Sequence, residues 1–382
     1  MKRLLLLLTL SCLLTTLTAQ TDLPIIHAQS DQVDIRVGDA FYEETWTIMP
    51  EYRPDPYLSS ALGEEITFYT DMDSISVTLE ANTEFDFVIL LNGQDSAFTR
   101  ISYEPSKLDI LRTAALYDDS EEAVFPEWTY QSADAPELVA LREGFKLDSI
   151  AGGGNEVSKM INIMHWLHDL VTHDGGSGNP AVRNAMSLIN TCRDEGRGLN
   201  CRGLSIVLNE CYLAMGFKSR YITCMPRDSV FQDCHVINMV WSEDLNKWLW
   251  MDPTQNACIM DETGTLLSIQ EVRARLINGE RLILNPDANW NRQNTTSVEW
   301  YLEYYMAKNL YRMECPIASQ SDYETLEDGR EVRYLELLPV EDYARETEAI
   351  IPNESDDEIK FYKYFTRNPD WFWANPYETT RR

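Results

Sequence analysis

The chain has 382 residues, of which 32 are Lys or Arg and 62 are Asp or Glu, so its formal net charge at pH 7 is −30. A surface this acidic repels phosphate backbones, and we therefore expect no nucleic-acid partner. Beyond the N-terminal leader, no segment is apolar over the length that a membrane-spanning helix needs. The length is sufficient for two domains, each with its own core.

The first residues, MKRLLLLLTLSCLLTTLTAQ, have the pattern of a secretory signal peptide. A positive start and a Leu-rich run precede Ala19, a small residue suited to cleavage. We therefore expect residues 1–19 to be removed and the protein to be exported, into the periplasm or the medium. Lipidation at Cys12 would instead tether the chain to a membrane. The apolar run before Cys12 is short, and Thr9 stands where Leu is usual, which favours cleavage.

Residues 20–118 show the two-residue alternation of β-strands. In SISVTLE and FDFVILL every second residue is apolar, namely Ile75, Val77, Leu79, Phe85, Phe87, Ile89 and Leu91. Asn92-Gly93 then predicts a hairpin turn, because both residues tolerate positive φ. Alternation with polar partners indicates antiparallel sheet with one face in water, and we expect a small β-sandwich-like domain.

An acidic connection follows at residues 119–154 and ends in AGGGN, where Asn155 can cap a helix. The apolar spacing predicts that this helix runs as far as His173. We expect an α+β core at residues 155–290. Residues 291–382 are expected to pack on that core, with a helix in TTSVEWYLEYYMAKNLYRM and a strand in REVRYLELL.

Metal sites are weakly indicated. His165 and His168 lie three residues apart on the predicted helix, but no H-E-x-x-H and no C-x-x-C occurs. We therefore expect neither a metal nor an organic cofactor. Seven cysteines follow the leader, so at least one thiol stays free even where disulfides form. Cys211 falls on the apolar face of a helix and is expected in the core.

One cysteine stands at a predicted helix start, in GLNCRGLSIVLNECYLAMGF. Asn200 is a good N-cap, an apolar stripe follows, and Gly216 can end the helix. Cys201 therefore falls in the first turn, where unpaired N–H groups and the helix dipole lower a thiol's pKa. The same N–H groups can stabilise an oxyanion on a carbonyl that the sulfur attacks.

A nucleophilic thiol needs a base, and the base needs an orienting group. His235 is the one histidine after Cys201, and it begins HVINMVW, which pairs naturally with KWLWMD across the turn SEDLN. If His235 lies directly opposite Asp252, the carboxylate can hold the imidazole. A one-residue slip would put the two on opposite faces.

These pieces resemble the transglutaminase-like superfamily, which has a papain-like core. The resemblance rests on GLNCRGLSIVLNECYLAMGFKSRYITCMP, CHVINMVW and KWLWMDPT, and spans about residues 156–254. It implies that Cys201 is the nucleophile, His235 its base and Asp252 the group that orients the base. Arg202 follows the cysteine where many relatives carry a small or acidic residue, so an anionic group is expected at this site. Trp166 and Asn179 are candidates for the oxyanion-hole side chain.

The resemblance implies thiol-dependent acyl transfer on a peptide or protein amide. The acyl group passes to water or to an amine, and hydrolysis is favoured because an exported enzyme meets water more often than any particular lysine. Transamidation, an amidase resembling the peptide-N-glycanases, and a non-catalytic binding module on the same fold remain alternatives. No loop suggests dependence on calcium.

Overall fold

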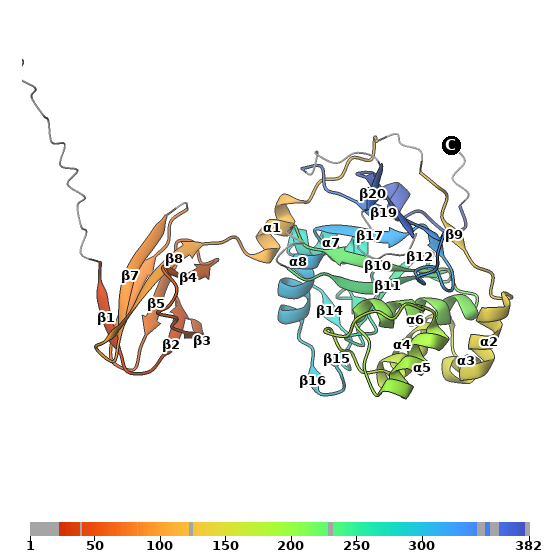
Figure 1. Ribbon diagram of the computed structural model, residues 1–382. Helices are drawn as coiled ribbons and strands as arrows, with labels where there is room; N and C mark the ends of the chain where they lie inside the picture. The colour runs from red at the N-terminus through yellow and green to blue at the C-terminus, as the bar shows by residue number, and fades with distance from the viewer. Residues whose placement is uncertain are drawn as a thin grey trace, which may run out of the picture. The chain divides into compact units, whose positions relative to one another are not determined.

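The computed structural model describes residues 23–38, 40–81, 83–121, 125–227, 232–341, 348–351 and 359–378 (Figure 1). The expected signal peptide and Cys12 lie outside these ranges. The chain divides into two compact units, Met1–Pro105 and Ser106–Arg382. Within the described ranges, no helix is both long and apolar enough to cross a bilayer, and the seven cysteines are unpaired.

The described part of the first unit contains eight strands: β1 (Ile25–Ala28), β2 (Gln32–Val37), β3 (Ala40–Thr47), β4 (Asp55–Ser59), β5 (Glu65–Tyr69), β6 (Ser74–Thr78), β7 (Glu84–Leu91) and β8 (Asp95–Tyr103). They form two four-stranded sheets, in the orders β1-β7-β8-β4 and β3-β2-β5-β6. The predicted inward residues Phe87 and Ile89 meet Ile66 and Phe68 of the other sheet in one core.

The second sheet of the first unit is antiparallel throughout, as expected. In the other sheet, β7 and β8 form the predicted hairpin, with Asn92 and Gly93 at φ 54° and 67°. Its two edge strands, however, pair in parallel, β1 with β7 and β4 with β8. The mixed sheet differs from the purely antiparallel expectation, because alternation sets which face is buried and not the direction of an edge strand.

The helices of the second unit are α1 (Lys107–Thr113), α2 (Pro136–Phe145), α3 (Leu147–Ala151), α4 (Glu156–Leu170), α5 (Ala185–Glu195), α6 (Cys201–Ala214), α7 (Ile269–Asn278), the π-helix η1 (Glu299–Met306), α8 (Ala307–Asn309) and α9 (Pro369–Phe372). Its strands are β9 (Thr129–Tyr130), β10 (Ser219–Met225), β11 (His235–Ser242), β12 (Lys247–Met251), β13 (Ile259–Met260), β14 (Ile283–Leu284), β15 (Asn289–Trp290), β16 (Asn294–Thr295), β17 (Arg312–Pro316), β18 (Ala318–Ser319), β19 (Glu331–Leu337), β20 (Glu348–Ile351) and β21 (Lys360–Thr366).

A seven-stranded sheet is the centre of the second unit, in the order β12-β11-β10-β17-β19-β21-β20. Its central strands are buried on both faces. Val236 and Val240 face the core formed with α4, α5 and α6, whereas Ile237 and Met239 face a second core that includes η1 and α7. Figure 1 shows α4, α5 and α6 together on one side of the sheet. The segment after residue 291 therefore supplies strands to the central sheet as well as covering helices.

Helix α4 begins where Asn155 predicts, because the Asn155 side chain accepts from Ser158 N at 2.9 Å. It ends at Leu170, three residues before the expected end at His173. Thr172 and Asp174 instead pair through their backbones with Leu199, the residue before the N-cap of α6. Gly198 permits this close approach, since a Cβ there would lie 2.4 Å from the Thr172 carbonyl oxygen.

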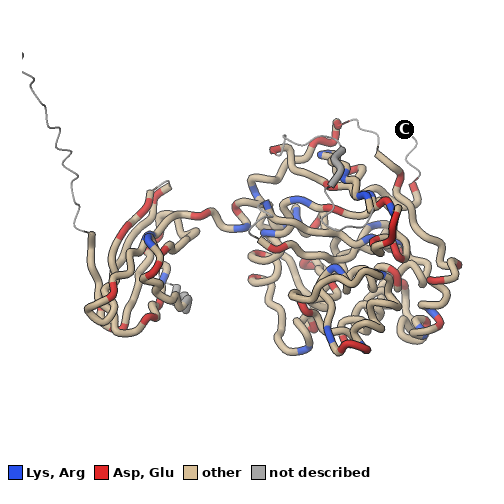
Figure 2. The backbone as a smooth tube through the Cα atoms, in the orientation of Figure 1, with Lys and Arg blue, Asp and Glu red and all other residues tan. Residues whose placement is uncertain are grey.

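Charge is distributed over both units. Figure 2 shows Asp and Glu spread along the described chain, with Lys and Arg interspersed. Several of the acidic side chains are buried and paired, for example Glu336 with Arg312 at 2.6 Å. The acidic residues are therefore spread over the described chain and are not confined to one segment.

Candidate active site

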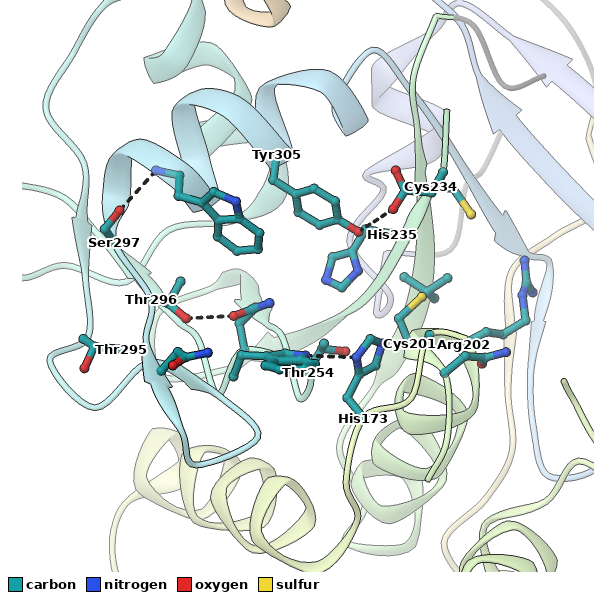
Figure 3. A pocket seen from close by; sticks show the side chains of 18 of the residues that line it. His173, Cys201, Arg202, Cys234, His235, Thr254, Thr295, Thr296, Ser297 and Tyr305 are labelled. Carbon is teal, nitrogen blue, oxygen red and sulfur yellow. Dashed lines mark hydrogen bonds between the residues drawn. The ribbon is translucent and has the colours of Figure 1, made fainter. Parts of the chain in front are cut away.

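Cys201 is the first residue of α6, as the sequence predicts. The side chain of Asn200 accepts a hydrogen bond from Gly203 N at 3.0 Å, which caps the helix, and donates to the Ser177 carbonyl at 2.9 Å. The cap fixes the direction of the first turn, so the Cys201 side chain lines a cavity of about 710 Å³ (Figure 3). Cys211, on the same helix, is fully buried in the core.

His235 and Asp252 meet across the hairpin of β11 and β12. His235 Nε2 lies 2.8 Å from Asp252 Oδ2, and both side chains are buried. The predicted register is wrong by two residues, because Asn238 pairs with Met251 and Asp252 lies just beyond the end of β12. A two-residue shift keeps both side chains on one face, so they meet diagonally instead of directly.

Asp252 is held by four hydrogen-bond donors. His235 Nε2 and the Tyr301 hydroxyl reach Oδ2 at 2.8 and 2.5 Å, and the backbone N–H groups of Thr254 and Gln255 reach Oδ1 at 2.8 and 3.3 Å. Burial alone would raise the pKa of the Asp252 carboxyl, but the charge and hydrogen bond of His235, with Tyr301 and Thr254, keep that pKa below its ordinary value. The carboxylate is therefore ionised and fixed in orientation.

The pKa values of Cys201 and His235 move in opposite directions. Burial would raise the pKa of the Cys201 thiol, but hydrogen bonds from His173 and His235 and the charge of His235 lower it to about 6. Burial would lower the pKa of His235, but Asp252 and Cys201 raise it to about 10. Each of the six other described cysteines has its pKa raised, chiefly by burial. Between these two values the site holds a thiolate beside an imidazolium.

The bond to Asp252 determines which ring nitrogen of His235 faces the sulfur of Cys201. Because Nε2 is bonded to Asp252, Nδ1 is the nitrogen left for Cys201. The Tyr305 ring packs edge-on against the imidazole, with centroids 5.3 Å apart. The Tyr305 hydroxyl in turn donates to Asp233 at 3.3 Å. The imidazole therefore has one open nitrogen, directed to Cys201.

A second histidine, His173, lies beside Cys201 and was not selected from the sequence. Figure 3 shows both imidazoles next to the Cys201 side chain. Trp290 Nε1 donates to His173 Nδ1 at 3.1 Å, and both residues line the cavity. Tyr301, which also donates to Asp252, is likewise not among the residues that the sequence indicates. No local pattern marks these residues, since their positions depend on pairing between distant segments.

The two candidates for the oxyanion-hole side chain lie in different places. Asn179 lines the same cavity as Cys201. Trp166 belongs to α4 and packs against Phe145 with ring centroids 5.5 Å apart, within the helical layer. It does not line the cavity, so only Asn179 is placed to contact a substrate there.

Arg202 is already paired within the protein. Its guanidinium lies 2.5 Å from Glu324 Oε1 and donates to the Thr223 hydroxyl at 2.9 Å. Glu324 is buried and also accepts from the hydroxyl groups of Tyr221 and Tyr334. The charge of Arg202 is therefore matched by Glu324, and the expected preference for an anionic group does not follow from it.

The histidine pair of α4 is occupied by protein partners. His168 is buried, with Nδ1 2.9 Å from the Pro253 carbonyl and Nε2 3.0 Å from Asn289 Oδ1. His165 Nε2 lies 3.2 Å from Asp287. His168 thus has no nitrogen left for a metal, and it connects α4 to the residue after Asp252. Across the described residues, no group of three or more His, Cys, Asp or Glu side chains is arranged to hold a metal ion.

Comparison with known proteins finds a family match for part of the chain. Residues 145–253 match the model of the transglutaminase-like superfamily. The search of curated proteins gives no match. Among solved structures, a candidate cysteine protease from Cytophaga hutchinsonii is similar at 18% identity and a TM-score of 0.24, over 42% of this chain and 51% of that one. The red sea bream transglutaminase is similar at 12% identity and a TM-score of 0.22, over 61% and 49%. The chain therefore spans about half the length of each.

Proposed function

We propose that this protein cleaves amide bonds of peptides or proteins through Cys201, because residues 145–253 match the model of the transglutaminase-like superfamily, whose members typically carry out thiol-dependent acyl transfer. The observation that carries the proposal is the thiol whose pKa is lowered to about 6 beside His235, which Asp252 holds at 2.8 Å. A non-catalytic module has no need of an activated thiol, and burial would raise its pKa instead.

In the first half-reaction the Cys201 thiolate adds to the carbonyl carbon of the amide. The S–C bond forms while the π electrons of C=O move to oxygen. His235 then gives its Nδ1 proton to the amide nitrogen, the C–N bond breaks, and the amine leaves. A thioester on Cys201 remains, and Asp252 keeps the imidazole in position throughout.

In the second half-reaction water replaces the amine. His235 Nδ1 takes a proton from water as the water oxygen adds to the thioester carbon. The C–S bond then breaks, which releases a carboxylic acid and restores the thiolate and the imidazolium. Water at ~55 M competes strongly with any amine that lacks its own binding groove, so we propose hydrolysis and not cross-linking.

The cavity favours a neutral substrate with apolar and hydrogen-bonding groups. Trp290, Trp300 and Tyr305 supply aromatic surface, and amide or hydroxyl side chains such as Asn294 and Thr295 stand beside them. The charged groups are paired, Arg202 with Glu324 and Asp233 with Lys308. Pockets of this kind bind by apolar contact and are oriented by a few polar groups.

The test combines a peptide-amide substrate library with a labelled primary amine at millimolar concentration. We expect acid products from the unmodified chain and none from Cys201→Ala. If most of the acyl product carries the amine, the reaction is transamidation. If no amide is cleaved and a thiol reagent labels Cys201 no faster than Cys234, which is exposed in the same cavity, the proposal is wrong.

We also propose that the protein is exported, on the evidence of the leader MKRLLLLLTLSCLLTTLTAQ alone. Expression of the full chain followed by cell fractionation and N-terminal sequencing tests this. The expected N-terminus is Gln20. An N-terminus at Cys12 with an attached lipid would instead show anchoring to a membrane.

A further inference from the structure

The hairpin of β15 and β16 forms hydrogen bonds with both the backbone and the ring of His173. Asn291, in the turn of that hairpin, accepts from His173 N at 2.7 Å and donates to the His173 carbonyl at 2.9 Å. Trp290, one residue earlier, donates from Nε1 to His173 Nδ1 at 3.1 Å. On the side away from the hairpin, the backbone of His173 pairs with Leu199, next to the cap of α6. The imidazole is therefore fixed relative to both the hairpin and the nucleophile.

The bond from Trp290 determines which nitrogen of His173 carries the proton. An indole N–H can only donate, so His173 Nδ1 accepts and has no proton of its own. The ring proton is then on Nε2, the nitrogen left to meet Cys201. His235 is placed the other way round, with Nε2 bonded to Asp252 and Nδ1 directed to the sulfur. The two histidines beside Cys201 therefore have different chemical roles.

His173 cannot act as the base, because its one unprotonated nitrogen is occupied by Trp290. Its Nε2–H is a fixed donor beside the sulfur, where negative charge appears on the carbonyl oxygen once the thiolate has added. The backbone N–H of Cys201 belongs to the same residue as the sulfur and has no partner within the helix, whereas Gly203 N is bonded to the Asn200 cap. A donor held in place before the reaction stabilises an oxyanion most effectively.

We propose that His173 Nε2–H is the side-chain donor of the oxyanion hole, and that Trp290 is the positioning residue that keeps its proton on Nε2. The proposal rests on the acyl transfer proposed for Cys201. As the C–S bond forms and the C=O π electrons move to oxygen, His173 donates to that oxygen without giving up its proton. The donation ends when the C–N bond breaks and the carbonyl reforms.

Kinetics on the full-length protein test the catalytic role. We expect His173→Ala to lower kcat by ~10²- to 10³-fold with little change in KM, as for loss of one oxyanion donor. His173→Gln, which keeps an N–H donor, should recover part of this loss. Asn179→Ala is the matched comparison, because Asn179 is the other donor side chain considered for the same role. If Asn179→Ala costs more than His173→Ala, or His173→Ala keeps wild-type kcat, the assignment is overturned.

A measurement that needs no turnover tests the tautomer. In a ¹⁵N-histidine-labelled Cys201→Ala protein, we expect the His173 resonances to show a proton on Nε2 and none on Nδ1. Trp290→Phe should disturb that pattern, whereas Trp300→Phe, which alters the same cavity without contacting His173 by a hydrogen bond, should leave it intact. A proton on Nδ1 would overturn the proposal even if Cys201 proves catalytic. If the unmodified protein cleaves no amide while the tautomer is as stated, that result would count against Cys201 chemistry and leave the His173–Trp290 pairing supported.

Discussion

The hydroxyl of Tyr301 donates to the same oxygen of Asp252 that meets His235, at 2.5 Å. Tyr301 is fully buried and comes from η1, far along the chain from the hairpin that carries the other two residues. The helix that follows the α+β core in sequence thus sets the orientation of the proposed orienting group. The site depends on the C-terminal segment as well as on residues 145–253.

Tyr301→Phe should therefore lower kcat by about tenfold, since one hydrogen bond to a charged group is worth about 1.5 kcal/mol. KM should change little, because Tyr301 is not among the residues that line the cavity. Steady-state kinetics of the variant measure both. Tyr304→Phe, on the same helix but exposed, is the control for nonspecific effects. Equal kcat values for the two variants would contradict a positioning role.

The pH dependence follows from the pKa values of Cys201 and His235, about 6 and about 10. Below about pH 6 the thiolate takes up a proton and loses its nucleophilicity, and above about pH 10 the imidazolium loses the proton that the leaving amine needs. We expect a bell-shaped profile of kcat/KM between these limits. The rate at which iodoacetamide alkylates Cys201 should rise around pH 6, well below the pH at which an ordinary thiol becomes reactive. An alkylation midpoint near pH 9 would contradict the ion pair.

Much of the site could be predicted because its members carry local signals. Asn200 caps a helix, the alternation after His235 indicates a strand, and Asp252 precedes Pro253 at a strand end. The register was wrong by two residues, because Asp252 lies beyond β12 and bonds with Ala257 in a turn that the hairpin pattern does not describe. Because the error is an even number of residues, His235 and Asp252 still lie on one face of the hairpin.

His173 and Trp290 could not be predicted from local pattern. Apolar spacing extended the helix of α4 to His173, but Val171 is already extended in the structure and the chain pairs with Leu199. The contact to Trp290 joins two segments more than a hundred residues apart in sequence, and no periodicity reports such a contact. Arg202 was misjudged for the same reason, because its partner Glu324 comes from a distant turn.

Cys201→Ala should abolish turnover and leave the fold intact, because Cys201 lies at a cavity wall and packs less than the core residues of α6. Cys211→Ser is the matched variant on the same helix, and it should spare the chemistry while lowering the free energy of unfolding by about 1–3 kcal/mol, through burial of an unpaired hydroxyl. Thermal unfolding and amide cleavage, measured on both, separate the two effects. Residual activity in Cys201→Ala at the wild-type level would contradict the mechanism.

Asp252→Asn should lower kcat by several orders of magnitude, on the order of 10⁴ by analogy with serine triads, while KM changes little. The carboxamide can present its N–H to His235 Nε2, which would move the imidazole proton to Nδ1 and remove the base from Cys201. The rate of Cys201 alkylation at pH 7 should fall as well, because the imidazolium that stabilises the thiolate is lost. A variant that keeps rapid alkylation would show that Asp252 does not control the ion pair.

Glu210 gives a prediction about stability that is independent of the reaction. It is buried in α6 and accepts from Ala185 N at 2.9 Å and from the Ser321 hydroxyl at 3.1 Å. Burial raises the pKa of this carboxyl to about 8, against 4.5 for an exposed one. The folded protein therefore binds a proton that the unfolded chain has lost between these values, so its stability should fall as the pH rises from about 4.5 to about 8. Glu210→Gln stays neutral and keeps an acceptor oxygen for Ala185, so its stability should decline less over the same range.

Urea unfolding at pH 5 and pH 8.5 measures the change in the free energy of unfolding for both proteins. Glu195→Gln, at an exposed position at the end of α5, is the control. If wild type and Glu210→Gln lose the same free energy of unfolding between the two pH values, Glu210 is already ionised in the folded protein and the prediction is wrong.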